Sequence, residues 1–131
     1  MATTRDTLRR FYDALGRGDL PAGLSLLAPD IEWSEAERFP YYGGTWHGPQ
    51  AIVKGLFEPL SRDWNSFSTR PEHYVIENDQ AVVFGVYVGM HKRTGRSVTA
   101  PFAHHWTVRV GKIVRFVQYT DTAKVLEAMR D

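Results

Sequence analysis

A chain of 131 residues with a formal net charge of +1 and no cysteine fits one domain that folds around a single hydrophobic core. The lack of cysteine excludes a disulfide scaffold and thiolate catalysis, and the scattered, balanced charges argue against a dedicated nucleic-acid-binding protein. No stretch approaches the roughly 20 apolar residues of a membrane span, and the N-terminus lacks the apolar run of a signal peptide, so we expect a cytoplasmic protein without nucleic-acid or membrane partners.

The first half of the chain is predicted to form helices around one strand. Thr3 or Thr4 can cap a first helix, and Asp19 can cap a short second one. A strand is expected over residues 31–35, and Pro49 can open a third helix. The apolar residues that recur at helical spacing are Leu8, Phe11, Tyr12, Leu15, Leu20, Leu24, Leu27, Ile52, Val53, Leu56, Phe57 and Leu60.

From residue 72 onward the apolar pattern alternates with a period of two. Residues suited to tight turns separate the alternating runs, and Asp121 can cap a closing helix. Helices followed by a long antiparallel meander favour an α+β domain over residues 1–131, in which the sheet curls around the helices to bury one face. The strands are expected over residues 74–77, 81–90, 97–110 and 112–120.

Polar residues fall on sheet positions that ought to be apolar. His105 shares an alternation face with Ala103, and Gln118 shares one with Phe116. Because buried polar groups need partners, we expect these four residues on the concave side of the sheet, around a pocket completed by a ligand or water. His104 is then expected on the outer face, together with Trp106 and Val108, where a subunit interface would explain the aromatic residues.

Three segments resemble the nuclear transport factor 2-like superfamily, specifically its SnoaL-like branch related to polyketide cyclases and ketosteroid isomerases. They read FYDALGRGDLPAGLSLLAPDIEW, WHGPQAI and HHWTVRVGKIVRFVQYTDT, and the resemblance covers essentially the whole chain. The resemblance implies a cone-shaped, cystatin-like α+β barrel in which N-terminal helices pack on a strongly curved antiparallel sheet. It further implies a pocket inside the cone for a small hydrophobic molecule, and a homodimer that forms through the outer sheet face.

The resemblance also assigns individual positions. The catalytic carboxylate of the ketosteroid isomerases falls on Glu35, but their two oxyanion-binding positions fall on Phe11 and Ala103, so steroid isomerisation is not expected. The last-strand carboxylate of the cyclases falls on Gln118, which cannot carry a proton away. Asp121, three residues further on, could supply that acid in a slightly different register.

The candidate catalytic residues are therefore Glu35, His105 and Asp121. Glu35 is either a solvated residue at a strand end or a buried base whose pKa is raised by burial among aromatic rings. His105 is either fixed in the core by a backbone carbonyl or able to relay a proton. The loop over residues 38–48 could close over a ligand as a lip. The residues expected to line the ligand site are Tyr12, Trp33, Tyr42, Ala103, Phe116 and Gln118.

Two classes of function remain open at this point. The first is an enzyme without a cofactor that acts on a small, oxygen-bearing hydrophobic molecule by proton transfer, as an isomerase, cyclase, dehydratase or hydrolase. The second is a non-catalytic ligand-binding or dimerisation domain. The histidines lack the spacing of a metal site, so we expect neither a metal ion nor a cofactor.

Overall fold

The computed structural model describes residues 3–41 and 44–131. Side-chain caps start three of its helices as the sequence predicts, because Thr3, Asp19 and Asp121 each accept a hydrogen bond from a backbone N–H of the following turn. Thr3 completes a capping box with Asp6. The helices that begin at these caps are α1 (Thr4–Gly16), α2 (Leu20–Leu24) and α5 (Thr122–Ala128).

The third predicted helix is a continuous helical segment with a π-helical middle. It consists of α3 (Pro49–Ile52), the π-helical turn η1 (Val53–Phe57) and α4 (Glu58–Asp63). A Cβ atom at Gly55 would lie 2.8 Å from the Trp46 ring, so only glycine lets that indole pack directly on the segment. Sequence periodicity did not predict the π-helical turn, since one wider turn hardly disturbs an apolar stripe.

One six-stranded sheet forms the other layer, in the order β2-β1-β6-β5-β4-β3. The strands β3 to β6 make the predicted antiparallel meander, whereas β1 pairs in parallel with β6, so the sheet is mixed. The short strand β2 pairs antiparallel with β1 inside the predicted loop region. The strands are β1 (Leu27–Ser34), β2 (Thr45–His47), β3 (Trp64–Glu77), β4 (Gln80–His91), β5 (Ser97–Arg109) and β6 (Lys112–Thr120).

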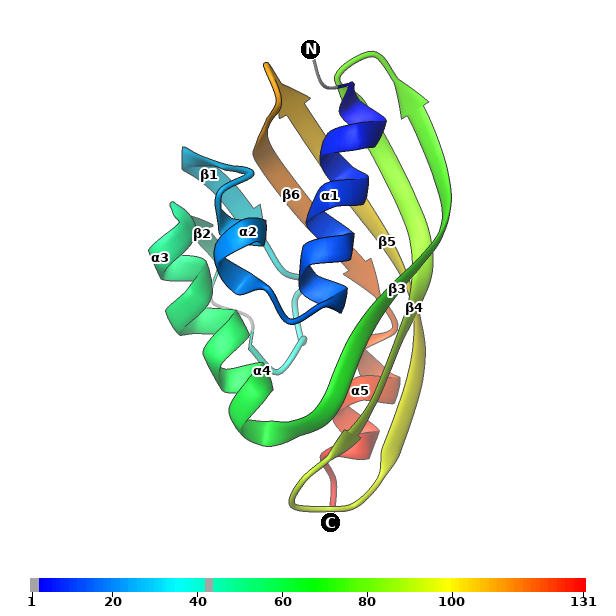
Figure 1. Ribbon diagram of the computed structural model, residues 1–131. Helices are drawn as coiled ribbons and strands as arrows, with labels where there is room; N and C mark the ends of the chain where they lie inside the picture. The colour runs from blue at the N-terminus through cyan, green and yellow to red at the C-terminus, as the bar shows by residue number, and fades with distance from the viewer. Residues whose placement is uncertain (1–2, 42–43) are drawn as a thin grey trace.

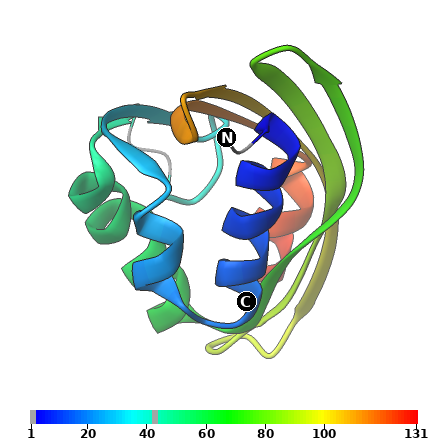
Figure 2. The same cartoon turned by 45° about the horizontal axis from the view of Figure 1, so that its top comes forward.

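The sheet curves around α1 and encloses it on one side, as Figures 1 and 2 show. The helices α2, α3 and α4 lie on the same, concave side, and α5 closes the end of the sheet against β5. The α+β cone expected from the sequence is therefore confirmed, and its interior lies between α1, the α3–α4 segment and the concave face of the sheet.

The edge strand β3 begins at Trp64 rather than at residue 74. Its first half is polar, and most of residues 65–70 are exposed or only half-buried. An edge strand has a single neighbour and little apolar packing, so its backbone pairing leaves no alternating pattern in the sequence. Register shifts against β4, between Asn65 and Ser68 and between Pro71 and His73, weaken that pattern further.

Candidate functional site

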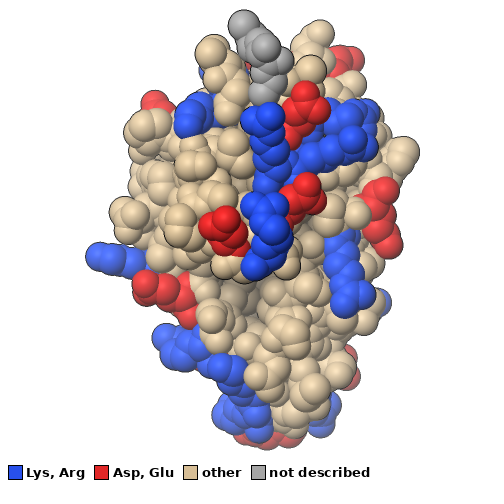
Figure 3. All heavy atoms as spheres, viewed as in Figure 1, with Lys and Arg blue, Asp and Glu red and all other residues tan. Residues whose placement is uncertain are grey.

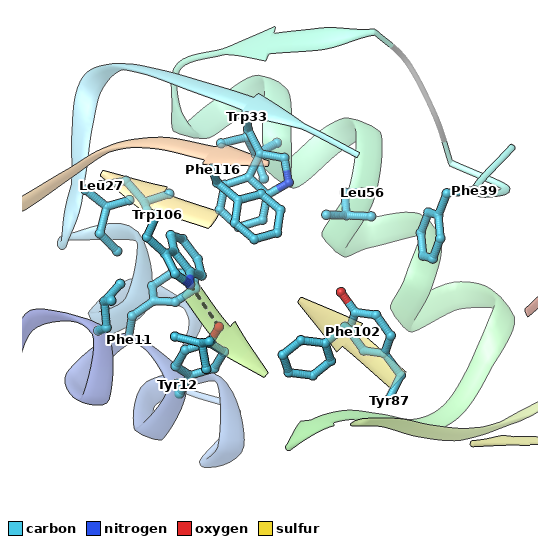
Figure 4. Close-up of a cluster of buried hydrophobic side chains, with 14 of the residues drawn as sticks. Phe11, Tyr12, Leu27, Trp33, Phe39, Leu56, Tyr87, Phe102, Trp106 and Phe116 are labelled. Carbon is cyan, nitrogen blue, oxygen red and sulfur yellow. Dashed lines mark hydrogen bonds between the residues drawn. The ribbon is translucent and has the colours of Figure 1, made fainter. Parts of the chain in front are cut away.

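Aromatic side chains from five elements converge inside the cone. Figure 4 shows rings from α1, β1, β4, β5 and β6 gathered around one interior. A cavity of about 40 Å³ lies among them, with Leu56, Phe57 and Leu60 of the helical segment on its far side. One water molecule needs roughly 10–15 Å³, so this space admits a few waters or a small polar head group. The aromatic residues around the cavity are Phe11, Tyr12, Trp33, Phe39, Phe57, Tyr87, His104, Trp106 and Phe116.

A buried histidine joins two tyrosines at this cavity. The hydroxyl of Tyr12 lies 2.6 Å from Nδ1 of His104, and the hydroxyl of Tyr87 lies 2.6 Å from its Nε2. The imidazole also stacks on Phe102, with 3.8 Å between ring centroids. Burial holds the pKa of His104 well below its ordinary value of 6.5, so the imidazole is neutral at physiological pH.

Each tyrosine hydroxyl has a second partner. Trp106 Nε1 donates to the Tyr12 oxygen at 2.9 Å, and Gln118 Nε2 donates to the Tyr87 oxygen at 2.8 Å. The other end of the Gln118 amide accepts the backbone N–H of Ala36 at 3.0 Å, which fixes the orientation of the amide. Gln118 therefore holds Tyr87 in place from a position next to the end of β1.

Counting protons in this network leaves one tyrosine hydroxyl with an unused donor. A neutral imidazole has one N–H and one bare nitrogen, so one tyrosine donates to the ring and the other accepts from it. The accepting tyrosine already accepts a second hydrogen bond, from Trp106 if it is Tyr12 or from Gln118 if it is Tyr87. Its own O–H proton has no partner in this network and is available to an oxygen in the cavity.

Glu35 lies at the same cavity and is 5% exposed. Burial raises its pKa to about 8, and the neighbouring Trp33 indole offsets only part of this effect. By hydrogen-bond geometry, neither Glu35 Oε2 nor Trp33 Nε1 has a partner among the described residues. Of the two interpretations of Glu35 in the sequence, burial at the pocket is therefore confirmed, and at pH 7 the group is mainly a neutral carboxylic acid.

The side chains around the cavity offer hydrogen-bond donors without a full positive charge. The Trp33 N–H, the spare tyrosine O–H and the protonated Glu35 can each donate to a ligand oxygen. No lysine or arginine stands among the described residues that line this cavity. A buried anion needs a cationic partner, so the lining suits an uncharged, oxygen-bearing ligand better than a carboxylate or phosphate.

The predicted orientation of β5 is wrong. His104, Trp106 and Val108 are buried on the concave side, whereas His105 and Ala103 lie on the convex side. No bulge inverts the alternation along β5, since buried and less buried residues alternate from Val98 to Val108. The error was the assumption that His105 shares a face with Gln118, because the register pairs His104 with Gln118 and Trp106 with Phe116.

His105 and Ala103 consequently lie away from the cavity. His105 Nε2 contacts Gln80 Oε1 at 2.8 Å on the outer surface. Asp121 caps α5 through the Lys124 N–H and does not line the cavity. The structure thus brings together Glu35, Tyr12, Trp33, Phe116 and Gln118 and leaves out His105, Ala103 and Asp121. Tyr42 lies outside the described residues.

Sequence reasoning missed His104 and Tyr87 as pocket residues. The signal for His104 was present, because Ala100, Phe102, Trp106 and Val108 share its face and are more apolar than the residues of the opposite face. Tyr87 had no comparable signal, since β4 is apolar on both faces.

Two further features of the described chain bear on function. Among residues 3–41 and 44–131 no three histidine, aspartate or glutamate side chains group closely enough to hold a metal ion. No helix among the described residues is long and apolar enough to cross a membrane.

Known proteins similar to this chain are SnoaL-like or NTF2-like proteins. A family model for the SnoaL-like domain matches residues 8–116. The crystal structure of an NTF2-like protein from Burkholderia thailandensis E264 is 35% identical to this chain, with 100% of both chains covered and a TM-score of 0.95. An NTF2-like protein of unknown function from Burkholderia pseudomallei K96243 is 29% identical over 100% of both chains, with a TM-score of 0.90.

A third similar structure contains a small molecule. TerC, co-crystallized with polyporic acid, is 26% identical and has a TM-score of 0.86, with 99% of this chain and 100% of TerC covered. No curated protein matches the chain.

Proposed function

Because this chain belongs to the SnoaL-like family, we propose that its cone interior binds a small, uncharged, largely apolar molecule through one oxygen atom. The observation that carries the proposal is the spare tyrosine O–H at His104, which lies in a cavity lined mainly by aromatic and aliphatic side chains. A ligand oxygen that accepts this proton completes the network, and the rings bury the apolar remainder. The complex of TerC with polyporic acid supports a small-molecule ligand for a close relative of this fold.

We further propose that the site transfers protons without a cofactor, with Glu35 as the group that carries the proton. A carboxyl group with a pKa of about 8 is close to neutrality, where either protonation state is accessible. At pH 7 the protonated group donates to a leaving or enolic oxygen, and at higher pH the carboxylate accepts a proton. The tyrosine donor would stabilise negative charge that develops on the bound oxygen during such a step.

The alternative is a pocket that binds the same class of ligand without chemistry. Its support is that Gln118, at the position of a family carboxylate, is committed at both ends to Ala36 and Tyr87. His104 is committed to the two tyrosines, which leaves Glu35 as the one carboxyl group at the cavity among the described residues. The site therefore lacks a second group for reactions that need a separate acid and base, and it suits ligand binding or a single proton transfer better.

An activity screen distinguishes the two functions. Small ketones, lactones, epoxides and hydroxylated aromatic compounds would be tested for binding by native mass spectrometry and for turnover by NMR at pH 7 and pH 9. For any compound turned over, Glu35→Gln should lower kcat by at least about 10²-fold while the dissociation constant changes little. Unchanged turnover in Glu35→Gln would contradict the role of Glu35, and binding without any turnover would support the alternative.

We also propose that two copies associate through the convex face of the sheet. After Gln80 at its start, the convex residues of β4 are all apolar, namely Val82, Phe84, Val86, Val88 and Met90. A strand that is apolar on both faces is ordinarily buried on both, yet Phe84 is 44% exposed and Met90 is 42% exposed. The registered row Phe84, Ala103 and Tyr119 extends this apolar surface across three strands. A second copy would present the same surface and cover it.

A further inference from the structure

A second hollow lies beside the inner cavity. It has a volume of about 610 Å³ and lies between the end of α1, the helix α4 and the first half of β3. Leu15, Phe57, Leu60 and Thr69 line both spaces, so no more than a layer of side chains separates them. Figure 3 shows the face that carries this region, where an uncharged depression lies between the charged side chains over α1 and others below.

The wall of this outer hollow is built with a strained bulge. Ser66 adopts a φ of 50°, a left-handed conformation that is unfavourable for a serine, at the register shift between Asn65 and Ser68. The bulge places the Phe67 ring in the hollow and against Tyr87, with 5.2 Å between centroids. Strained residues persist where the surrounding structure holds them, and they concentrate at ligand sites.

The same wall is tied to the inner network by close packing. A Cβ atom at Gly89 would lie 3.1 Å from the Cα of Phe67, so the small residue lets β3 approach β4 at the bulge. Phe67 therefore packs against the Tyr87 ring on one side and lines the open hollow on the other. The hydroxyl of Tyr87 belongs to the His104 network, so Phe67 connects the outer hollow to that network.

The two spaces differ in size and polarity in a complementary way. The inner cavity of about 40 Å³ has the unpaired hydrogen-bonding groups but little room. The outer hollow of about 610 Å³ has room, and its inner wall is apolar, with Leu20, Phe57 and Phe67. Serine hydroxyls and the exposed Arg17 stand at its solvent side. A ligand of ordinary size needs about 300 Å³ or more, so the inner cavity holds only part of one, and the outer hollow offers room for the rest.

We propose that the outer hollow is the second half of the ligand site and takes an apolar tail carried by the molecule whose oxygen accepts the spare tyrosine O–H of the His104 network. This inference rests on the proposed function of the inner cavity and adds the shape of the ligand. The class of ligand that fits is an elongated amphiphile. Its oxygen-bearing head lies in the inner cavity, and an alkyl or acyl tail of several carbons extends past Leu15, Phe57 and Leu60 into the outer hollow. The end of the tail can carry polar groups, because serines line the hollow there.

A homologous series tests this shape. Binding of 4-alkylphenols, from 4-methylphenol to 4-hexylphenol, would be measured by isothermal titration calorimetry. Each added methylene that reaches the outer hollow should tighten binding roughly three- to fourfold, since burying one methylene is worth about 0.8 kcal/mol. Ser61→Trp adds bulk at an exposed position that lines only the outer hollow, and Glu58→Trp makes the same change on the same helix away from both spaces.

Ser61→Trp should bind 4-methylphenol like the wild type but lose most of the gain with tail length, whereas Glu58→Trp should keep the full gain. An unchanged affinity for 4-methylphenol also shows that the variant is folded. A flat affinity across the series in the wild type, or equal behaviour of the two variants, would overturn the outer subsite and leave the inner one standing. Failure of the whole series to bind the wild type would instead contradict the proposed function.

Discussion

The imidazole of His104 lies 2.6 Å from the hydroxyl of Tyr87, and both side chains are buried in the centre of the cone. Tyr12 holds the other ring nitrogen at the same distance. Removal of the imidazole would therefore leave two buried hydroxyls with one partner fewer each. A buried polar group that loses its partner costs about 1–3 kcal/mol.

His104→Leu should accordingly lower the free energy of unfolding by about 2–4 kcal/mol in urea denaturation. His105→Leu is the matched control, because its side chain lies on the convex surface with Gln80 and should change stability by less than about 0.5 kcal/mol. Equal effects of the two substitutions would contradict the assignment of His104 to the interior.

The raised pKa of Glu35 predicts a stability that falls as pH rises. In the unfolded chain this carboxyl ionises near its ordinary value of 4.5, but in the folded protein it stays neutral up to about pH 8. Below pH 4.5 the carboxyl group is protonated in both the folded and the unfolded protein, so it does not change the stability. Between pH 4.5 and about 8 it ionises only in the unfolded chain, which stabilises the unfolded state. The free energy of unfolding should thus decrease from about pH 5 to pH 8 by at least about 2 and at most about 5 kcal/mol.

Glu35→Gln removes this titration while keeping the shape of the side chain. Urea denaturation at pH 5, 7 and 9 should show that the variant gains stability relative to the wild type as pH rises. Parallel curves for the two proteins would mean that Glu35 titrates like a solvated carboxyl group.

Tyr87→Phe should weaken the binding of oxygen-bearing ligands about 3- to 10-fold, because it removes a hydroxyl of the network at the cavity. Tyr119→Phe removes a hydroxyl from a side chain that is 59% exposed on the convex surface and should leave affinity unchanged. Calorimetric titration with 4-methylphenol measures both. An unaltered affinity in Tyr87→Phe would exclude its hydroxyl from the binding site.

Phe84→Glu should convert a dimer to a monomer in sedimentation velocity at micromolar concentration, since it places charges opposite each other at the centre of the apolar surface. Val110→Glu serves as the control, because that residue is 88% exposed in the turn between β5 and β6. A wild-type protein that sediments as a monomer would contradict the association through the convex face.

The turn at Val110 offers a stabilising change. Val110 and Gly111 have φ angles of 51° and 72°, which matches a two-residue hairpin turn that prefers Asn-Gly. A β-branched residue is strained in this conformation, so Val110→Asn should raise the free energy of unfolding by about 1 kcal/mol. Thermal denaturation checks this, and Val75→Asn, at an exposed strand position, should instead lower stability.

Local chemistry made most of the fold predictable. The caps at Thr3, Asp19 and Asp121 and the turns between the last four strands depend on neighbouring residues, and the structure confirms them. The family resemblance correctly indicated the cone, whereas the structure decided between the two interpretations of Glu35. These features are local or recur throughout a family, so a single sequence contains them.

The centre of the site depended on tertiary structure. Alternation along β5 defines two faces but does not say which one packs on α1, and a histidine is compatible with either until its partners are known. His104 is acceptable in the core because Tyr12, 92 residues away, and Tyr87 satisfy its two nitrogens. By itself, then, the sequence determined the order of elements and the family. Only the fold decided which polar side chains meet inside the cone, because those contacts join residues that are distant in the chain.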